Sequence, residues 1–588
     1  MKKWIRNILI TAILILTIVY FYWILPVWGV PFNSQRHEKL PLTPSWVLEN
    51  WLWEDDVNTS AYIDELLQGY KEHDIPVRTI ILDSPWSLRY NDFEIDTIRY
   101  PQPEKWFKNL QDNDYRVVLW MTSLINSNSK DSRINDSEEW YNRIKEKGYL
   151  VKSKHLNHWW KGDGGFLDYS NPEAVKWWRS KQQKLFDYGI DGWKLDGAAT
   201  LFYSKIAGLP FFYKDSKEGL MTTRKYMDLY YREEYKHGLT QNPEFVTLSR
   251  AIDGLYAHPE GFSPFDSSPV NWVGDQKHTW AELKDEKERE EDNVDLVMEG
   301  AEGITMAIEH VLASAKLGYN VIGSDIAGFS GSKIPPRLYI RWTQFSAFCG
   351  LFMNGGHGER RLWKRSKEEL EIIRKFSWMH TELIPYMYHY VVSAHNGERR
   401  LQTVMNIGKY QYMFGDDFLV APIYIDSKKR SVSLPEGEWR YFFNDIELLE
   451  GGLTFEREYP IDEFPVYIKE GAIVPMKISR AYTNIGDNES EGFTTLLIYP
   501  KDKNSFTYYH SNNSGETEIS YRLKDKLFVS INGDKIAHIL RIHSEKAVKN
   551  VILDGEKLDK KNWSYDSQNH KITIRTSNYT EGEYEIQY

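Results

Sequence analysis

The sequence predicts an α/β fold: a (β/α)8 TIM barrel followed by two C-terminal β-sandwich domains, with a transmembrane helix before the barrel. Three observations predict it. Eight short apolar runs alternate with helical patterns over residues 45–394, as in a parallel α/β barrel. Short β-rich runs separated by turns follow beyond residue 395, as in antiparallel sandwiches. An uncharged apolar run lies near the N-terminus.

The N-terminal segment predicts a membrane anchor. Three basic residues among the first six precede an uncharged run from Asn7 to Gln35. About 20 apolar residues span a bilayer, so this run is long enough to cross one. The leading positive charges predict a cytoplasmic N-terminus, and Trp23 and Trp28 suit the membrane interface. We therefore expect residues 1–32 to be a cytoplasmic tip and single-pass anchor, with the rest of the chain extracytoplasmic. The alternative is secretion after signal cleavage, although no A-x-A-like exit follows.

The barrel is expected over residues 45–394, after a linker at residues 33–44. Ser45–Trp51 predicts the first strand, and a helical pattern that Asn58 or Thr59 can cap follows it. Helical patterns also separate most of the later strands. These are expected at Val77–Leu82, Arg116–Met121, Gly189–Asp196, Glu244–Arg250, Val270–Asp275, Asn320–Asp325 and Leu351–Gly355.

One of these strands carries the clearest chemical signal. Asn171 can cap the helix before it, Pro172 fits the first helical position, and a glycine ends that helix. Successive strand side chains point to opposite faces, so Lys194 and Asp196 share a face. Gly197 then breaks the strand. A carboxylate and an ammonium group are therefore expected together at the C-terminal end of a barrel strand, where chemistry sits in this fold.

The C-terminal part predicts two further domains. Short strands such as Phe418–Ile423 and Phe464–Ile468 indicate a proximal sandwich over residues 395–480, and a second set indicates a distal β domain over residues 481–588. Neither shows a catalytic cluster. The charge run at residues 284–292, inside the barrel region, predicts a solvated helix face without chemistry.

Composition excludes several functions. The net charge of −11 and the isoelectric point near 5.9 argue against nucleic-acid binding, because no basic stripe is available to neutralise phosphates. A single cysteine, Cys349, permits no intrachain disulfide. No His, Glu and Asp spacing typical of a metal site is present, and we expect neither a metal nor a cofactor. The 22 Trp and 38 Tyr suit carbohydrate, although large barrels also pack many aromatic residues.

Charged residues recur where the predicted strands end. For any single aspartate, a surface loop or a helix cap is the alternative explanation. A barrel mouth with several carboxylates nevertheless suits cleavage of a glycosidic bond, in which one carboxylate attacks the anomeric carbon and another protonates the leaving oxygen. The residues in these positions are Asp83, Asp196, Asp275 and Asp325, together with Arg250 and His357.

Several motifs, in a shared order from about Trp46 to Pro475, resemble glycoside hydrolase family 31. Gly189–Asp196 looks like the nucleophile strand of this family, and Asn271–Asp275 looks like its Trp-x-Gly-Asp acid/base segment. Gly323–Phe329 is similar to its Asp-Ile-Gly-Gly-Phe turn. Further similar segments are Leu248–Arg250, Tyr339–Gln344, Leu383–Tyr388, Phe414–Pro422 and Asp462–Pro475.

The resemblance implies a retaining exo-α-glycosidase, most simply an α-glucosidase, that acts on an oligosaccharide or glycoside. It implies Asp196 as the nucleophile and Asp275 as the general acid/base. Trp193 is a further candidate for the pocket wall, but strand alternation favours core packing for it. The segment that ends at His357 is one residue longer than the usual pattern of the family. The alternative for His357 is therefore a loop histidine that does not bind the ligand. The substrate-binding residues that the resemblance implies are Asp83, Trp86, Lys194, Arg250, Trp272, Asp325, Trp342 and His357.

The sequence also departs from the family. An N-terminal β-sandwich usually contributes a loop to the active site, and here only residues 33–44 separate the expected span from the barrel, so we expect a different pocket rim. Ala199 stands where many members place a glutamate, and Arg337 stands where an acidic residue is frequent. Asp83–Trp86 and Asp92–Asp96 look more like the α-xylosidase branches. A transglycosylase, an α-xylosidase or α-galactosidase, and a catalytically silent carbohydrate-binding membrane protein are the alternatives. Sugar, linkage and oligomeric state are left open.

Overall fold

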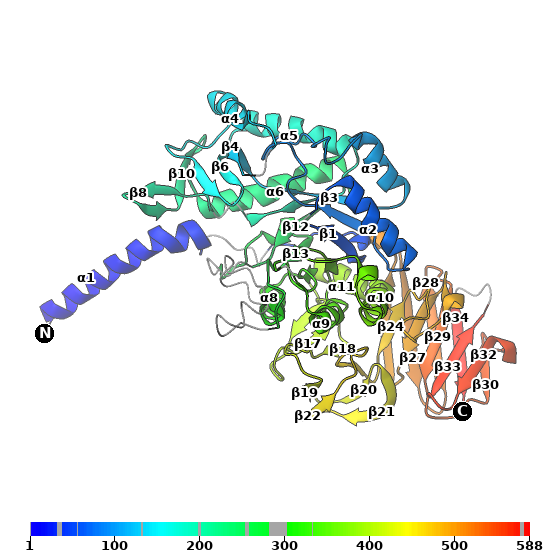
Figure 1. Ribbon diagram of the computed structural model, residues 1–588. Coiled ribbons are helices and arrows are strands. Elements are labelled where there is room, and N and C mark those ends of the chain that lie inside the picture. The colour runs from blue at the N-terminus through cyan, green and yellow to red at the C-terminus, as the bar shows by residue number, and fades with distance from the viewer. Residues whose placement is uncertain are drawn as a thin grey trace.

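The barrel forms the centre of the molecule in a computed structural model of the chain (Figure 1). The structure describes residues 2–31, 38–55, 57–130, 133–197, 201–252, 258–280, 303–331, 333–576 and 581–588. Two predicted segments lie outside the described residues: residues 33–37 of the linker and the charge run at residues 284–292.

Eight parallel strands build the barrel, as the sequence predicts. Their order around the sheet is β14-β13-β12-β7-β3-β2-β1-β15. A parallel bridge between Asp325 and Met353 joins the two edge strands and nearly closes the sheet. The strands are β1 (Trp51–Glu54), β2 (Thr79–Leu82), β3 (Arg116–Met121), β7 (Gly192–Leu195), β12 (Val246–Arg250), β13 (Val270–Trp272), β14 (Ile322–Gly323) and β15 (Met353–Asn354).

Helices alternate with these strands, and their ends follow local sequence signals. The Asn171 side chain accepts a hydrogen bond from the backbone N–H of Glu173, and proline occupies the first turn of α5. Ser366 and Glu369 form a reciprocal capping box at the start of α10. The helices are α2 (Ser60–Glu72), α3 (Pro103–Asp112), α4 (Ser137–Glu146), α5 (Pro172–Asp187), α6 (Thr223–Gln241), α8 (Gly303–Leu317), α9 (Pro336–Ser346), α10 (Lys367–Glu382) and α11 (Ile384–His395).

The first strand begins later than its apolar run suggests. Ser45–Leu48 forms a short 3-10 helix, η3, and β1 starts only at Trp51, whose backbone N–H bonds to the carbonyl of Phe352, the residue before β15. A short apolar run that is buried on all sides has the same periodicity in a strand and in a helical turn. The prediction of a strand over Ser45–Trp51 is therefore wrong for most of its length.

Two β excursions rise from the barrel, and the sequence did not indicate either of them. They follow β3 and β7, so both leave the C-terminal ends of barrel strands. The first is a three-stranded sheet of β4 (Leu124–Ser129), β5 (Asn157–Trp159) and β6 (Gly162–Phe166). The second consists of two hairpins, β8 (Ser204–Ile206) with β9 (Leu209–Phe211) and β10 (Tyr213–Ser216) with β11 (Gly219–Thr222).

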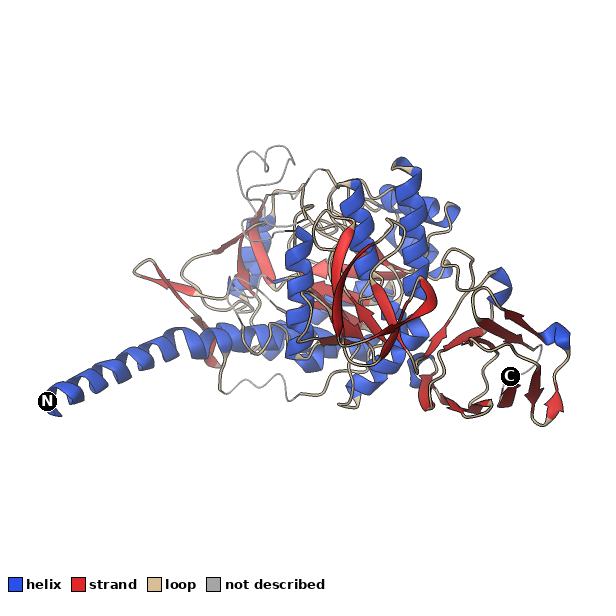
Figure 2. Cartoon of the chain, turned by 90° about the horizontal axis from the view of Figure 1, so that it is seen from below, coloured by secondary structure: helices blue, strands red, loops and turns tan. Residues whose placement is uncertain are grey.

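The N-terminal apolar segment is a helix that leaves the body of the protein. α1 (Lys2–Val19) continues as a π-helical segment, η1 (Tyr20–Trp28), which packs against α6. Both views show α1 projecting away from the barrel (Figures 1 and 2). Within Lys3–Trp28, which has 26 residues, an 18-residue window reaches a mean hydropathy of 2.6, so this helix is long and apolar enough to cross a membrane. An uncleaved anchor and a signal sequence both have this form.

Two β domains follow the barrel. The proximal domain contains a six-stranded sheet and a two-stranded sheet. The distal domain contains a five-stranded sheet and a six-stranded sheet, which form a sandwich. β24 lies before residue 480 but pairs with β25, so the distal sheet begins earlier than the expected boundary. The proximal strands are β16 (Gln402–Val404), β17 (Tyr412–Phe414), β18 (Phe418–Val420), β19 (Lys429–Leu434), β20 (Glu438–Tyr441), β21 (Asn444–Glu450), β22 (Leu453–Glu458) and β23 (Val466–Lys469). The distal strands are β24 (Ile473–Met476), β25 (Thr494–Ile498), β26 (Lys503–Tyr509), β27 (Glu516–Leu523), β28 (Leu527–Gly533), β29 (His538–His543), β30 (Asn550–Leu553), β31 (Glu556–Lys557), β32 (Trp563–Asp566), β33 (Lys571–Arg575) and β34 (Gly582–Gln587).

A buried arginine joins the barrel to the proximal domain. Arg341 of α9 donates hydrogen bonds to the carbonyl oxygens of Glu463 at 2.6 Å and of Tyr459 and Pro460 at 3.1 Å. Gln344, one turn later, donates to the carbonyl of Ile461 at 2.7 Å. Burial lowers the pKa of Arg341 to about 10, so the guanidinium stays charged at neutral pH and its bonds to carbonyls are charge-assisted.

Candidate active site

The face at the C-terminal ends of the barrel strands brings the predicted charged residues together. Lys194, in β7, forms a buried ion pair with Asp83, just after β2, with Nζ 2.6 Å from Oδ2. Burial raises the pKa of Asp83 to about 6, which is still below neutral pH. Burial alone would lower the pKa of Lys194, but the attraction of Asp83, Asp325 and Asp196 raises it. The pair is therefore ionic at pH 7.

Asp196 follows the last residue of β7 and is held by three donors. The indole Nε1 of Trp120 donates to its Oδ2 at 3.0 Å, and the backbone N–H of Gly197 donates to its Oδ1 at 2.6 Å. Arg250 Nη2 lies 3.5 Å from the same Oδ1. Burial alone would raise the pKa of Asp196, but Arg250 and Lys194 hold it below its usual value. Asp196 is therefore an ionised carboxylate at neutral pH.

Arg250, at the end of β12, connects Asp196 to Asp275. Its Nη2 lies 2.6 Å from Oδ2 of Asp275 and 3.5 Å from Oδ1 of Asp196. These two oxygens can therefore be no farther apart than the sum of the two distances. Gly274 explains part of this geometry, because its φ of 109° suits glycine and a Cβ there would lie 2.8 Å from Arg250 Nη1. The glycine before Asp275 leaves room for the guanidinium.

Asp325, after β14, is the most deeply buried carboxyl of the group. It is 1% exposed, and neither of its oxygens has a hydrogen-bond partner among the described protein groups. Burial raises its pKa to about 8, against the attraction of Lys194. A buried polar group without a partner is costly unless a ligand or water satisfies it. Asp325 is thus suited to accept or donate hydrogen bonds to a hydroxyl-bearing molecule.

The tryptophans predicted to bind sugar are fully buried. Trp86 donates its indole N–H to the carbonyl of Trp120 at 2.7 Å, and Trp342 donates to Ser324 Oγ at 2.9 Å. Trp272 lies under two cations, 5.4 Å from Lys194 Nζ and 4.8 Å from Arg250 Cζ. These rings can form the wall behind the polar groups, but they present almost no free surface for stacking.

His357 lies on the same face as part of a pair that the sequence did not indicate. Its Nε2 is 3.1 Å from Oδ2 of Asp55, the residue after β1. The fully buried guanidinium of Arg360 donates to the carbonyls of His357, Gly328 and Ile326, which fixes this loop against the turn that carries Asp325. Asp55 follows a strand end as the predicted aspartates do, and that position is the signal that could have identified it.

Two further aromatic residues at this face were missed. Trp53, in β1, stacks on Phe329 and has Lys194 Nζ 3.9 Å from its ring centroid. Trp120, in β3, donates to Asp196 as described above. Trp193, on the same strand as Lys194, packs instead against Phe186 and Phe245, away from the charged face. This separation follows the alternation of strand side chains.

Carboxyl groups and cations alternate on this face. Among the described residues, five carboxyl groups, those of Asp55, Asp83, Asp196, Asp275 and Asp325, lie with three permanent cations, Lys194, Arg250 and Arg360, and the raised pKa of Asp325 leaves that carboxyl largely protonated at neutral pH. Preorganised carboxylates in a site that excludes water stabilise a developing cation more strongly than water does. In the part of the chain that the structure describes, no group of three or more His, Cys, Asp or Glu residues could hold a metal ion.

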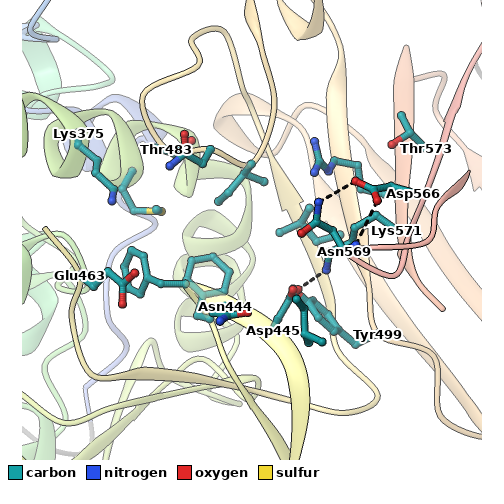
Figure 3. A pocket seen from close by; sticks show the side chains of 18 of the residues that line it. Lys375, Asn444, Asp445, Glu463, Thr483, Tyr499, Asp566, Asn569, Lys571 and Thr573 are labelled. Atoms are coloured by element: carbon teal, nitrogen blue, oxygen red, sulfur yellow. Dashed lines mark hydrogen bonds and ion pairs between the residues drawn. The ribbon is translucent and has the colours of Figure 1, made fainter. Parts of the chain in front are cut away.

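A separate cavity of about 580 Å³ lies between α10 and the two C-terminal β domains (Figure 3). Inside it, Lys571 is paired with Asp445, which also accepts a hydrogen bond of 2.5 Å from the hydroxyl of Tyr499. Its lining includes none of the residues predicted to act on or hold a sugar. This cavity is therefore distinct from the charged face at the C-terminal ends of the barrel strands.

Comparison with family models covers most of the barrel and the proximal β domain. The model described as "Glycosyl hydrolases family 31 TIM-barrel domain" matches residues 40–288 and 296–390. The model described as "Glycosyl hydrolase family 31 C-terminal domain" matches residues 385–474.

Curated relatives and solved structures are similar at low identity. An α-xylosidase from Emericella nidulans is 23% identical over 74% of this chain and 54% of its own length. An isomaltosyltransferase from Sporosarcina globispora is 23% identical over 78% of this chain and 44% of its own. The chain thus spans about half the length of these relatives.

Solved structures share the fold. A family 31 dextranase from Flavobacterium johnsoniae, complexed with isomaltotriose, has a TM-score of 0.77 at 21% identity, covering 95% of this chain and 73% of that one. The cycloalternan-forming enzyme of Listeria monocytogenes has a TM-score of 0.76 at 20% identity, covering 94% and 56%.

Proposed function

This chain belongs to glycoside hydrolase family 31, and from that premise we propose that it is a retaining exo-acting α-glycosidase. The observation that carries the proposal is the pair of aspartates that share one guanidinium, Asp196 and Asp275. Two carboxyl groups on either side of a glycosidic bond are what hydrolysis with retention requires. The substrate is a terminal α-linked sugar, most simply glucose.

Asp196 is the proposed nucleophile. Its pKa is held below its usual value by Arg250 and Lys194 despite burial, so the attacking carboxylate is ionised. It attacks the anomeric carbon as the glycosidic C–O bond breaks, which gives a covalent glycosyl-aspartate. The N–H groups of Trp120 and Gly197 fix its two oxygens before the reaction.

Asp275 is the proposed general acid and then the general base. In the first step it gives its proton to the leaving oxygen, and in the second it takes one from the water that attacks the anomeric carbon. Its Oδ2 is bound to Arg250 in the structure, so the first step requires that contact to open when the substrate enters. A sugar near Asp196 would separate the two groups.

The distances support retention over inversion. The 3.5 and 2.6 Å distances from Arg250 Nη2 to Asp196 Oδ1 and Asp275 Oδ2 limit how far apart these two oxygens can lie. That limit is below the ~6.5 Å at which the range of carboxyl separations in inverting glycosidases begins. Retaining enzymes place the two carboxyl groups about 5–5.5 Å apart.

The remaining charged residues are proposed to hold the sugar. Both oxygens of Asp325 are buried and have no hydrogen-bond partner in the described part of the chain, which suits a pair of sugar hydroxyl groups. Asp83, Lys194, Arg250 and His357 complete the polar ring, while Trp86, Trp272 and Trp342 form the wall behind it.

Transfer to a second sugar is the alternative outcome of the same chemistry. The relatives include an isomaltosyltransferase, and the structural neighbours include a cycloalternan-forming enzyme, so acceptors other than water are used by similar proteins. An α-xylosidase is also among the relatives. Product analysis with excess acceptor saccharide separates transfer from hydrolysis.

A panel of 4-nitrophenyl α-glucoside, α-xyloside and α-galactoside tests the enzyme proposal, with Asp196→Ala as the control. We expect release of nitrophenol from at least one glycoside by the natural chain only, with the α-anomer as the first product by NMR. Equal rates for the natural chain and the variant on every sugar would refute an enzymatic role. A β-anomeric first product would refute retention.

We also propose that the N-terminal helix is an uncleaved anchor with the barrel outside the membrane. The uncharged apolar stretch of this helix and the basic residues Lys2, Lys3 and Arg6 at its start support this orientation. N-terminal sequencing of the membrane fraction tests it: an intact N-terminus is expected, and a mature chain that starts after residue 28 would show signal cleavage instead.

A further inference from the structure

The hairpin of β8 and β9 carries an apolar pair at its tip that faces solvent. Ile206 and Leu209 are directly opposite each other in the register and are 58% and 65% exposed. The turn between them, Ala207-Gly208, has positive φ at both residues, as a type I′ hairpin turn requires. The hairpin is a separate two-stranded sheet. Such a hairpin is marginally stable in water, and an exposed apolar tip adds a hazard of aggregation.

β9 and the start of β10, which follows it, are tied to the η1 part of the N-terminal helix. The hydroxyl of Tyr22 donates to the carbonyl of Pro210 at 2.9 Å, and the hydroxyl of Tyr213 donates to the carbonyl of Phe21 at 2.8 Å. The ring of Phe212 packs edge-on against the rings of Tyr22 and Trp23, with centroids 6.0 and 5.2 Å away. The chain leaving Pro210 toward the tip therefore starts beside the end of the candidate span.

Both views show where the tip points. The hairpin projects from the barrel on the side from which α1 leaves, beyond the other elements of the body on that side (Figures 1 and 2). A membrane that surrounds α1 would meet this tip, because Tyr22 stands at the level where aromatic side chains with a polar end favour the membrane interface. Lys205, next to the tip, can reach the lipid headgroups with its ammonium group while its stem stays apolar.

We propose that the Ile206–Leu209 tip inserts into the interface of the bilayer that holds α1, as a second membrane contact of the extracytoplasmic part. This inference rests on the proposed anchor. An anchor alone leaves the barrel free to tilt about a single helix, whereas a helix and a hairpin tip fix two points. The segment that carries the hairpin begins directly after β7 and Asp196. The contact thus adds a second point that sets the height of the barrel above the lipid.

The test uses the full chain in phosphatidylcholine vesicles with a polarity-sensitive fluorophore at position 207. The natural Cys349 is fully buried, and burial raises the pKa of its thiol, so it does not compete for the label at neutral pH. Labelled Ala207→Cys is expected to show a blue-shifted emission that doxyl lipids quench. Asp525→Cys, in the exposed turn between β27 and β28, is the matched control and is expected to stay aqueous.

A second variant separates the tip from the anchor. Ile206→Asp with Leu209→Asp is expected to abolish the quenching at position 207, while the protein still floats with the vesicles and hydrolyses a soluble aryl glycoside at an unchanged rate. Ile446→Asp with Leu448→Asp, an exposed apolar pair on β21, is the control and should leave the quenching unchanged. A protein that floats but shows an aqueous label at 207 would overturn the proposal and leave the anchor standing. A natural chain that does not float with the vesicles would overturn both the anchor and the tip contact.

Discussion

The indole nitrogen of Trp120 donates a hydrogen bond of 3.0 Å to Oδ2 of Asp196. Trp120 belongs to β3, the strand beside β7, and its ring stacks on that of Trp159 with centroids 6.2 Å apart. The stack and the strand register fix the indole, so its N–H is oriented toward the carboxylate without any reorganisation. A preoriented donor of this kind positions a nucleophile before the substrate arrives.

Trp120→Phe should therefore slow the enzyme more than it destabilises the fold. A hydrogen bond to a charged group contributes about 1.5–3 kcal/mol, which corresponds to a loss of roughly 10- to 100-fold in kcat/KM. Trp159→Phe is the control, because it removes a neighbour of Trp120 that does not contact Asp196. Steady-state kinetics with an aryl α-glycoside measure both, and an equal loss in the two variants would assign the effect to packing.

Replacement of the nucleophile has a stereochemical signature. Asp196→Ala should lose roughly 10³-fold or more in kcat, because the covalent route is closed. Azide can then enter the vacated space and attack an activated α-glycoside directly, so the expected product is the β-glycosyl azide, identified by NMR. If this variant formed the α-glycosyl azide instead, the nucleophile would have to be another residue.

Replacement of the acid/base should depend on the leaving group. Asp275→Ala removes proton donation worth about 10²–10⁴-fold for a sugar leaving group. A dinitrophenolate needs no proton, so its release in the first step should be nearly unaffected, and the covalent intermediate should accumulate as a burst. Stopped-flow and mass spectrometry measure the burst. The same fractional loss with every leaving group would contradict the assignment.

Asp325 should make the folded state less stable as the pH rises. Its folded pKa of about 8 lies above its ordinary value of 3.8, so the folded state binds the extra proton between these values. The contribution of Asp325 to stability is then most favourable below pH 3.8 and becomes less favourable up to about pH 8, by an amount on the order of a few kcal/mol. Asp325→Asn removes this loss. Its advantage in Tm over the natural chain should grow from pH 5 to 8, and a difference independent of pH would contradict the raised pKa.

The barrel was predictable from the sequence because its signals are local. Each strand is a short apolar run with a helical pattern after it, and caps such as Asn171 mark the helix starts. The hairpins between β7 and α6 were not predictable in this way. Their strands have three or four residues, which is too few for a period to stand out, and Leu209–Phe211 contains a proline.

Some residues of the candidate site were also predictable from local sequence signals, and others were not. Residues that end strands, such as Asp196 and Asp275, follow from periodicity and motif together. Arg360 could not be predicted, because its role depends on carbonyls of the turn after Asp325, more than 30 positions earlier in the chain. Trp120 is a mid-barrel residue by sequence, and only the register of β3 against β7 places it beside Asp196.

The contacts of Arg341 bear on how this protein can be divided for engineering. In a barrel produced without the proximal domain, the guanidinium of Arg341 would lose the carbonyl oxygens of Tyr459, Pro460 and Glu463 that now accept its hydrogen bonds. The charge would then lie on an apolar surface without these partners. Swapping C-terminal modules between homologues would break the same bonds unless the loop around residue 460 travels with the barrel. The smallest fragment that should be produced in soluble form therefore extends past this loop, whatever the catalytic residues themselves require.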